Sequence, residues 1–246
     1  MNPAINRPTL SSIALGARQV HTITDRFAMT NTYLVEGEQL IVVDPSSATH
    51  VHLLCDYLER VLHRSPREIR LVVLTHLHLD HTAGLHTLLE RCDAPVAASR
   101  MVRELVGARR RYGLPPLPHI AGQMLPRMLD QLDLFLPAYE RQMKYITTWL
   151  DDVDGLPVDA NWRVIASPGH TPDSLCLYNP FTAELLTGDT VVTIERNRPV
   201  ARGRTSPSLL EETLHTLRSL RVYFLYPGHG WPILARDPLS NVRIEW

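Results

Sequence analysis

The sequence predicts an α/β layered fold, and three observations support this prediction. Apolar, β-branched runs alternate with stretches of helical periodicity in both halves of the chain. Turn residues bound the apolar runs, as is typical of buried strands. The 246 residues are 44% hydrophobic and 21% charged, which is enough apolar material for a packed core. Length alone leaves open one large domain or two small ones.

The predicted strands share high β propensity and near-continuous apolarity, which is typical of strands buried on both faces. Between the first two, Glu36-Gly37-Glu38 predicts a hairpin turn. The predicted strands are Thr32–Val35, Leu40–Val43, Leu71–Leu74, Trp162–Ala166, Leu175–Tyr178, Glu184–Leu186 and Val222–Leu225.

Two stretches have the three- and four-residue apolar spacing of a helix that packs one face on a core. Ser208 and Glu211 have the spacing of a capping box, so we expect the second helix to begin at Ser208. The apolar positions are Val51, Leu54, Leu58 and Leu62 in the first helix, and Leu210, Leu214 and Leu217 in the second.

The stretch from about residue 100 to 150 differs, because it is helical in character but interrupted by prolines that end or kink helices. We interpret it as a helical insertion. Two roles stay open for it: a lid that shapes a substrate pocket, or a peripheral subdomain that only packs. The prolines are Pro115, Pro116, Pro118, Pro126 and Pro137.

The formal charge of −1 provides no global field that would attract nucleic acid or an acidic membrane surface. We expect a small-molecule substrate, no nucleic-acid partner and no membrane partner. The oligomeric state stays open, a homodimer included. Three widely spaced cysteines favour a reducing compartment, and no signal-like or membrane-spanning stretch is visible, so we expect a cytoplasmic location.

A cluster of metal-ligand types follows the strand Leu71–Leu74, in the run Thr75-His76-Leu77-His78-Leu79-Asp80-His81. Alternate side chains of an extended segment share a face, so His76 and His78 can reach one ion together. Asp80 and His81 can project from the following bend toward a neighbouring position. Imidazole and carboxylate suit zinc, iron or manganese.

Three further candidate ligands, His170, Asp189 and His229, each follow a predicted strand and a glycine. Glycine lets the backbone turn sharply and approach an ion closely. Seven candidate ligands exceed the four of a tetrahedral zinc site, which indicates two ions that share one carboxylate. Asp189 is the natural bridge because its two oxygens can serve both ions.

The run THLHLDH resembles the HxHxDH signature of the metallo-β-lactamase superfamily, and PGHTPDS, TGD and PGHG resemble its later ligand motifs. The resemblance covers the chain from Asn31 to His229. It implies a single domain over residues 1–246, a four-layer αββα sandwich with a metal cleft at one edge. It also implies a first metal on His76, His78 and His170, a second on Asp80, His81 and His229, and Asp189 between them.

The resemblance suggests a supporting role for Asp44, at the end of a predicted strand; a turn-forming aspartate before proline is the other interpretation. The expected cofactors are two divalent ions, zinc first and iron or manganese as alternatives. Arg202 and Arg204 could bind a substrate carboxylate or phosphate, or could be solvated loop residues.

The implied chemistry is hydrolysis by a metal-bridging hydroxide, with Asp80 as the catalytic residue that orients it and carries its proton. No cysteine lies near Asp189, as cysteine-ligand zinc β-lactamases require, and the glutathione-binding C-terminal domain of glyoxalase II is not evident. We therefore expect a dinuclear hydrolase of a small thioester, ester or lactone. The alternatives are a mononuclear iron oxygenase like the persulfide dioxygenases, and a non-catalytic metal-binding sensor.

Overall fold

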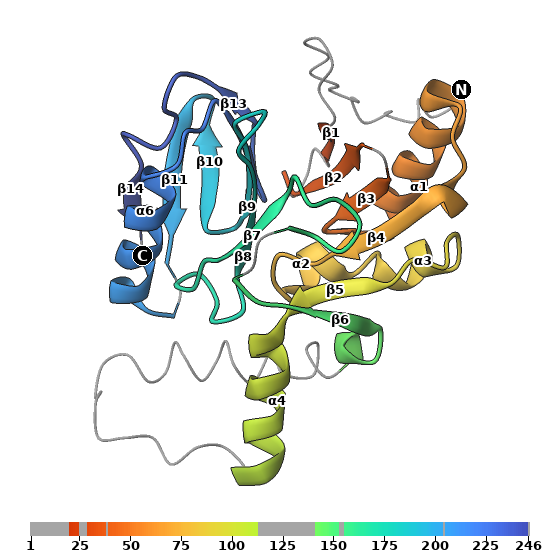
Figure 1. Cartoon of the computed structure of the whole chain (residues 1–246), viewed down its shortest axis with the longest axis horizontal. Coiled ribbons are helices and arrows are strands. Elements are labelled where there is room, and N and C mark those ends of the chain that lie inside the picture. Colours follow the sequence, from red (N-terminus) through yellow and green to blue (C-terminus); the bar gives the residue numbers. More distant parts are fainter. Residues whose placement is uncertain are drawn as a thin grey trace, which may run out of the picture.

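The computed structural model describes residues 20–24, 29–37, 39–112, 141–152, 155–203 and 205–245, with the side chains of 107–112 left aside. Figure 1 shows two large sheets facing each other, with helices on their outer sides. The predicted αββα layering is therefore confirmed.

The first sheet contains six strands in the order β1-β2-β3-β4-β5-β6. β1 to β3 pair antiparallel, and β3 to β6 pair parallel. The strands are β1 (Val20–Thr24), β2 (Asn31–Glu36), β3 (Leu40–Val43), β4 (Ile69–Val73), β5 (Val96–Ser99) and β6 (Ile146–Leu150).

The second sheet contains five strands in the order β13-β12-β9-β8-β7, and a three-stranded sheet of β10-β11-β14 accompanies it. Only β12 and β9 run parallel in the five-stranded sheet. The strands are β7 (Arg163–Ala166), β8 (Leu175–Asn179), β9 (Glu184–Gly188), β10 (Val191–Glu195), β11 (Arg198–Arg202), β12 (Phe224–Pro227), β13 (Ile233–Leu234) and β14 (Arg243–Glu245).

The helices cover the outer faces of the sheets. On the first sheet lie α1 (Ala48–Tyr57), which continues as a π-helix over Leu58–Leu62, α3 (Leu85–Leu89) and α4 (Arg100–Tyr112). On the second sheet lies α6 (Pro207–Arg218). The described residues also include two short helices, a 3-10 turn at Pro66–Glu68 and α2 (Leu79–Thr82).

Strand alternation divides the core into layers. Leu34, Val42 and Val72 face α1, α3 and α4, whereas their neighbours Val35 and Val43 face the second sheet. On the far side, the second sheet packs against apolar residues of α6, chiefly Leu210, Leu214 and Leu217. Because both faces of each large sheet are buried, the strands read as continuous apolar runs in the sequence.

Several predicted boundaries are corrected by the structure. The last helix begins at Pro207 with Ser206 as its N-cap, whose side chain accepts a hydrogen bond from the Leu209 N–H; the capping box expected at Ser208 and Glu211 is wrong. Proline at the first helical position explains the earlier start, because it lacks only an N–H that the helix does not use.

The predicted helical stretch over 100–150 contains a strand. Arg100–Tyr112 forms the expected helix, α4, but Ile146–Leu150 forms β6, because this β-branched and aromatic segment pairs parallel with β5. The prolines between them, and most of the proposed lid, lie outside the described residues. Among the described helices, none is long and apolar enough to cross a membrane.

Candidate metal centre

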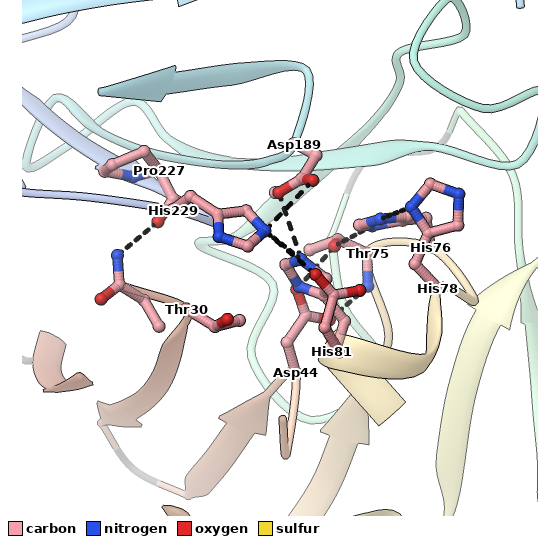
Figure 2. A network of polar contacts seen from close by, with 12 residues as sticks. Thr30, Asp44, Thr75, His76, His78, His81, Asp189, Pro227 and His229 are labelled. Carbon is pink, nitrogen blue, oxygen red and sulfur yellow. Dashed lines mark hydrogen bonds and ion pairs between the residues drawn. The ribbon is translucent and has the colours of Figure 1, made fainter. Parts of the chain in front are cut away.

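Four chain segments converge at one edge of the two large sheets, each at the end of a strand. The segment after β4 carries His76 and His78 and leads into α2, which carries Asp80 and His81. The loops after β7, β9 and β12 supply the remaining candidates, His170, Asp189 and His229. Figure 2 shows Asp189 from the second sheet above His81 and Asp44 from the first, with His76, His78 and His229 to either side.

A first group consists of His76, His78, His170 and Asp189, all buried. His78 Nδ1 lies 3.0 Å from His76 Nε2 and 3.2 Å from His170 Nε2. His170 Nε2 is 3.4 Å from Asp189 Oδ2. Three ring nitrogens and a carboxylate oxygen thus surround one point.

A second group consists of Asp80, His81 and His229. His229 Nε2 lies 3.2 Å from Asp80 Oδ2 and 3.4 Å from His81 Nε2. Asp189 also reaches this group, since its Oδ1 is 3.2 Å from His81 Nε2 and its Oδ2 is 3.4 Å from His229 Nε2. The Asp189 carboxylate therefore lies between the two groups.

Outer contacts orient several of the rings. His170 Nδ1 lies 3.2 Å from the Arg202 carbonyl oxygen, which can only accept, so Nδ1 carries the proton and Nε2 presents a lone pair toward His78. His81 Nδ1 lies 3.0 Å from Asp44 Oδ2, which fixes its ring in the same manner.

This donor arrangement fits cations. Lone pairs of neighbouring imidazoles repel one another at about 3 Å unless protons or a metal ion lie between them. In addition, Asp189 Oδ1 is buried, and its 3.2 Å contact with His81 Nε2 lacks hydrogen-bond geometry. These His/Asp clusters are consistent with a dimetal site.

Opposite pKa shifts distinguish the two groups. Burial, reinforced by the neighbouring His170, lowers the pKa of His78 to about 3. For His229, burial acts in the same direction, but hydrogen bonds to Asp189 and Asp80 outweigh it and raise the pKa to about 9. Burial also lowers the pKa of His81, but the charge of Asp189 and the polar contacts with Asp189 and Asp44 together raise it well above its usual value. Without metal, protons therefore occupy the second group at neutral pH.

Carboxylates in the site stay ionised. Burial raises the pKa of Asp80, but the hydrogen bond with His229 and the charge of His81 lower it to about 2. Burial also raises the pKa of Asp189, but the charge of His81 and the hydrogen bond with His229 hold it well below its usual range. Both side chains can therefore act as anionic ligands at neutral pH.

Asp44 links the two groups from beneath. Its Oδ1 accepts a hydrogen bond from the Thr75 N–H at 2.7 Å, and its Oδ2 accepts one from Thr75 Oγ1 at 2.6 Å. Thr75 Oγ1 in turn lies 3.1 Å from His76 Nδ1. Asp44 thus supports His81 directly and His76 through Thr75. Its positive φ of 53° also satisfies the turn interpretation.

Glycine allows the second sheet's loops to approach closely. A Cβ on Gly228 would collide with Asp189 Oδ1, and a Cβ on Gly188, at φ 49°, would lie 2.5 Å from Thr75 Oγ1. Side chains at these positions would push apart the loops that carry Asp189 and its neighbours.

Sequence analysis did not identify two supporting residues, Asn31 and Asp173. Asn31 opens β2, and its amide Nδ2 donates to the carbonyl oxygens of Pro227 and Gly230 at 2.8 and 2.9 Å, which holds the turn that carries His229. Asp173 Oδ2 accepts a hydrogen bond from Leu77 N–H at 3.1 Å and thereby joins the two loops of the first group. The motif PGHTPDS contains Asp173, whereas no local signal marks Asn31.

Solvent reaches the second group but not the first. The Asp80 side chain is 49% exposed and that of His229 is 19% exposed. His76, His170 and Asp189 are buried. Of the two arginines considered as anion ligands, Arg202 contributes its carbonyl oxygen to His170, and Arg204 lies outside the described residues.

The family model described as the metallo-beta-lactamase superfamily matches residues 25–229, most of the chain. "Probable metallo-hydrolase YflN" of Bacillus subtilis (strain 168) is 23% identical over 92% of this chain and 89% of its own length. "Atrochrysone carboxyl ACP thioesterase" of Aspergillus fumigatus is 28% identical over 82% of this chain and 50% of its own length. These similarities support a metal-dependent hydrolase.

Solved structures share the fold. BLEG-1 B3 metallo-beta-lactamase superimposes with a TM-score of 0.61 at 19% identity, over 90% of this chain and all of that chain. TTHA1623 in a di-iron-bound form gives a TM-score of 0.56 at 24% identity, over 87% of this chain and 93% of that chain. At such identities the similarity concerns the architecture only.

Proposed function

Because the chain belongs to the metallo-β-lactamase superfamily, we propose that it is a dinuclear metal-dependent hydrolase of a small-molecule thioester, ester or lactone. The observation that carries this proposal is the position of Asp189 between two donor groups, one of three histidines and one of two histidines and an aspartate. A structural site for a single zinc would need only four ligands and no exposed carboxylate.

The seven residues would form two metal sites. His76, His78 and His170 would hold one cation, Asp80, His81 and His229 the other, and Asp189 would bridge them. When bound, two divalent cations acidify water from a pKa of about 16 toward about 7 and polarise a carbonyl group. Zinc is the proposed metal, because imidazole and carboxylate donors suit it.

Asp80 is the proposed catalytic residue. Its side chain is half-exposed at the open end of the site, and its pKa of about 2 leaves it unprotonated at neutral pH. A carboxylate in that state can orient a water molecule and accept its proton.

An acyl substrate is favoured over other hydrolytic targets. The thioesterase named among the relatives acts on an acyl carrier protein, and the formal charge of −1 gives no general attraction for nucleic acid. We extend the proposal to a small-molecule partner and a cytoplasmic location.

The test combines metal analysis with a panel of thioesters, esters and lactones assayed on the same protein. We expect two divalent ions per chain, and turnover of at least one acyl class that is lost on chelation and restored by zinc. One iron per chain with oxygen uptake would instead favour an oxygenase. Full dual-metal loading without turnover of any acyl substrate would favour a sensor.

A further inference from the structure

The strand β10 runs outward from Asp189 and is joined to the turn that carries His229. The Thr193 N–H donates to the His229 carbonyl oxygen at 3.0 Å. Thr193 Oγ1 accepts a hydrogen bond from the Trp231 N–H and lies 2.9 Å from the Trp231 carbonyl oxygen. A Cβ on Gly230 would collide with the Thr193 carbonyl oxygen, so only glycine permits this approach. Trp231 is therefore held firmly, two residues beyond His229.

An arginine stacks on this tryptophan. Trp231 is 36% exposed, and Arg196, just past the end of β10, places its Cζ 4.9 Å from the centre of the indole system. Such stacking orients a guanidinium group, which keeps its positive charge. The N–H groups of the Arg196 guanidinium remain able to donate hydrogen bonds to another group.

No carboxylate neutralises Arg196 within the part of the chain that the structure describes. The adjacent Glu195 pairs with Arg198 instead, at 3.8 Å. Arg196 is exposed and lies in the turn between β10 and β11, three residues beyond Thr193. An oriented cation without a counter-ion thus lies on the hairpin that adjoins the exposed side of the candidate metal centre.

Resting on the proposed function, we infer that Arg196, stacked on Trp231, binds an anionic group of the acyl substrate, a carboxylate or a phosphate remote from the reacting carbonyl. A planar guanidinium binds either oxyanion with two parallel hydrogen bonds. The substrate class is therefore an acyl compound with an anionic group at one end, and neutral esters of the same length are poorer substrates.

Three thioesters distinguish an anionic group on the acyl chain from one on the leaving thiol. The octanoyl thioester of N-acetylcysteamine is neutral, its suberoyl analogue carries a carboxylate on the acyl chain, and octanoyl-coenzyme A carries phosphates on the leaving thiol. In the zinc-loaded protein, Arg196→Ala should raise the KM of one anionic substrate about tenfold relative to the neutral one, with kcat changed less than about twofold. The substrate affected identifies the source.

Matched variants test the stacking. Arg196→Lys retains the charge but loses the planar fork, so it should recover only part of the discrimination, whereas Trp231→Phe should retain most of it and Trp231→Ala should lose it. Arg60→Ala removes one exposed arginine from the π-helix after α1 and should leave the KM ratio unchanged.

A binding measurement keeps this inference separate from the proposed function. Calorimetry on zinc-loaded protein should show that suberate or coenzyme A binds about tenfold more weakly to Arg196→Ala than to the unmodified chain, with a difference that shrinks as salt increases. Equal binding of both probes to both proteins would overturn the role of Arg196. Failure of every thioester to turn over would overturn the hydrolase proposal, and calorimetry would still decide on Arg196.

Discussion

The Asp44 carboxylate and the His81 ring meet at 3.0 Å between Oδ2 and Nδ1, beneath the candidate metal centre. Both side chains are buried. The same Oδ2 accepts the hydrogen bond from Thr75 Oγ1 at 2.6 Å. One carboxylate therefore orients a member of each donor group, directly for His81 and through Thr75 for His76.

Replacing Asp44 should weaken metal binding without removing a proposed ligand. In Asp44→Asn, one oxygen becomes an NH₂ group, so the side chain cannot accept from the Thr75 N–H, Thr75 Oγ1 and His81 Nδ1 together. We expect metal affinity to fall about 10- to 100-fold, as measured by titration against a competing chelator. Asp56→Asn, at an exposed position of α1, is the control. Equal affinities for both variants would refute the supporting role.

Asp80→Asn should separate metal binding from turnover. The amide can still contribute an oxygen but cannot accept a proton from water, so metal content should stay near that of the unmodified protein while kcat falls by about two to four orders of magnitude. Metal analysis and kinetics on one preparation provide the measurement. Unchanged kcat would remove Asp80 from the chemistry.

Metal binding should release protons and strengthen with pH. In the metal-free protein, the Asp189 and Asp80 contacts raise the pKa of His229 to about 9, and the pKa of His81 is also raised, so both rings carry protons at pH 7 that cations must displace. Affinity should rise between about pH 6 and 9. Calorimetry in buffers of different ionisation enthalpy counts the protons, and a pH-independent affinity would contradict the arrangement.

The same shift predicts the stability of the metal-free protein. Because the folded-state pKa of His229, about 9, exceeds the ordinary value of 6.5, its protonation stabilises the fold fully below pH 6.5, and this contribution is lost as pH rises through 9. Thermal unfolding temperatures should therefore fall over this interval in metal-free protein. His229→Gln, which does not titrate, should reduce that fall; an equal fall in both proteins would exclude His229 as its source.

Exposure predicts an order of metal loss. Asp80 and His229 are the most exposed members of the two groups, whereas His76, His170 and Asp189 are buried. Brief chelation should remove one ion quickly and the other slowly. His229→Ala should bind one ion with the slow phase retained, as followed by metal release to a colorimetric chelator. Loss of both ions in one phase would contradict this order.

Much of this architecture was predictable because burial leaves a clear pattern. Continuous apolar runs such as Leu40–Val43 predict strands that are buried on both faces. Glycine before His170, Asp189 and His229 indicates turns at the ends of strands. The structure brings these residues together with His76, His78, Asp80 and His81, as expected. That they bind metal stays a prediction.

Other features depend on tertiary contacts that local sequence does not encode. β5 (Val96–Ser99) is only four residues long, and its pairing with β4 and β6 defines it more than its composition does. Asn31 acts on a turn 196 residues away through its bond to the Pro227 carbonyl oxygen. Its role appears only when β2 and β12 lie at the same edge.

A crystal structure of zinc-loaded protein, with anomalous scattering recorded at the zinc edge, tests the central claim most directly. We predict two peaks per chain, the first about 2.0–2.2 Å from ring nitrogens of His76, His78 and His170, and the second at the same range from Asp80, His81 and His229, with Asp189 oxygens reaching both. A single peak, or peaks away from these seven side chains, would contradict the two-metal account.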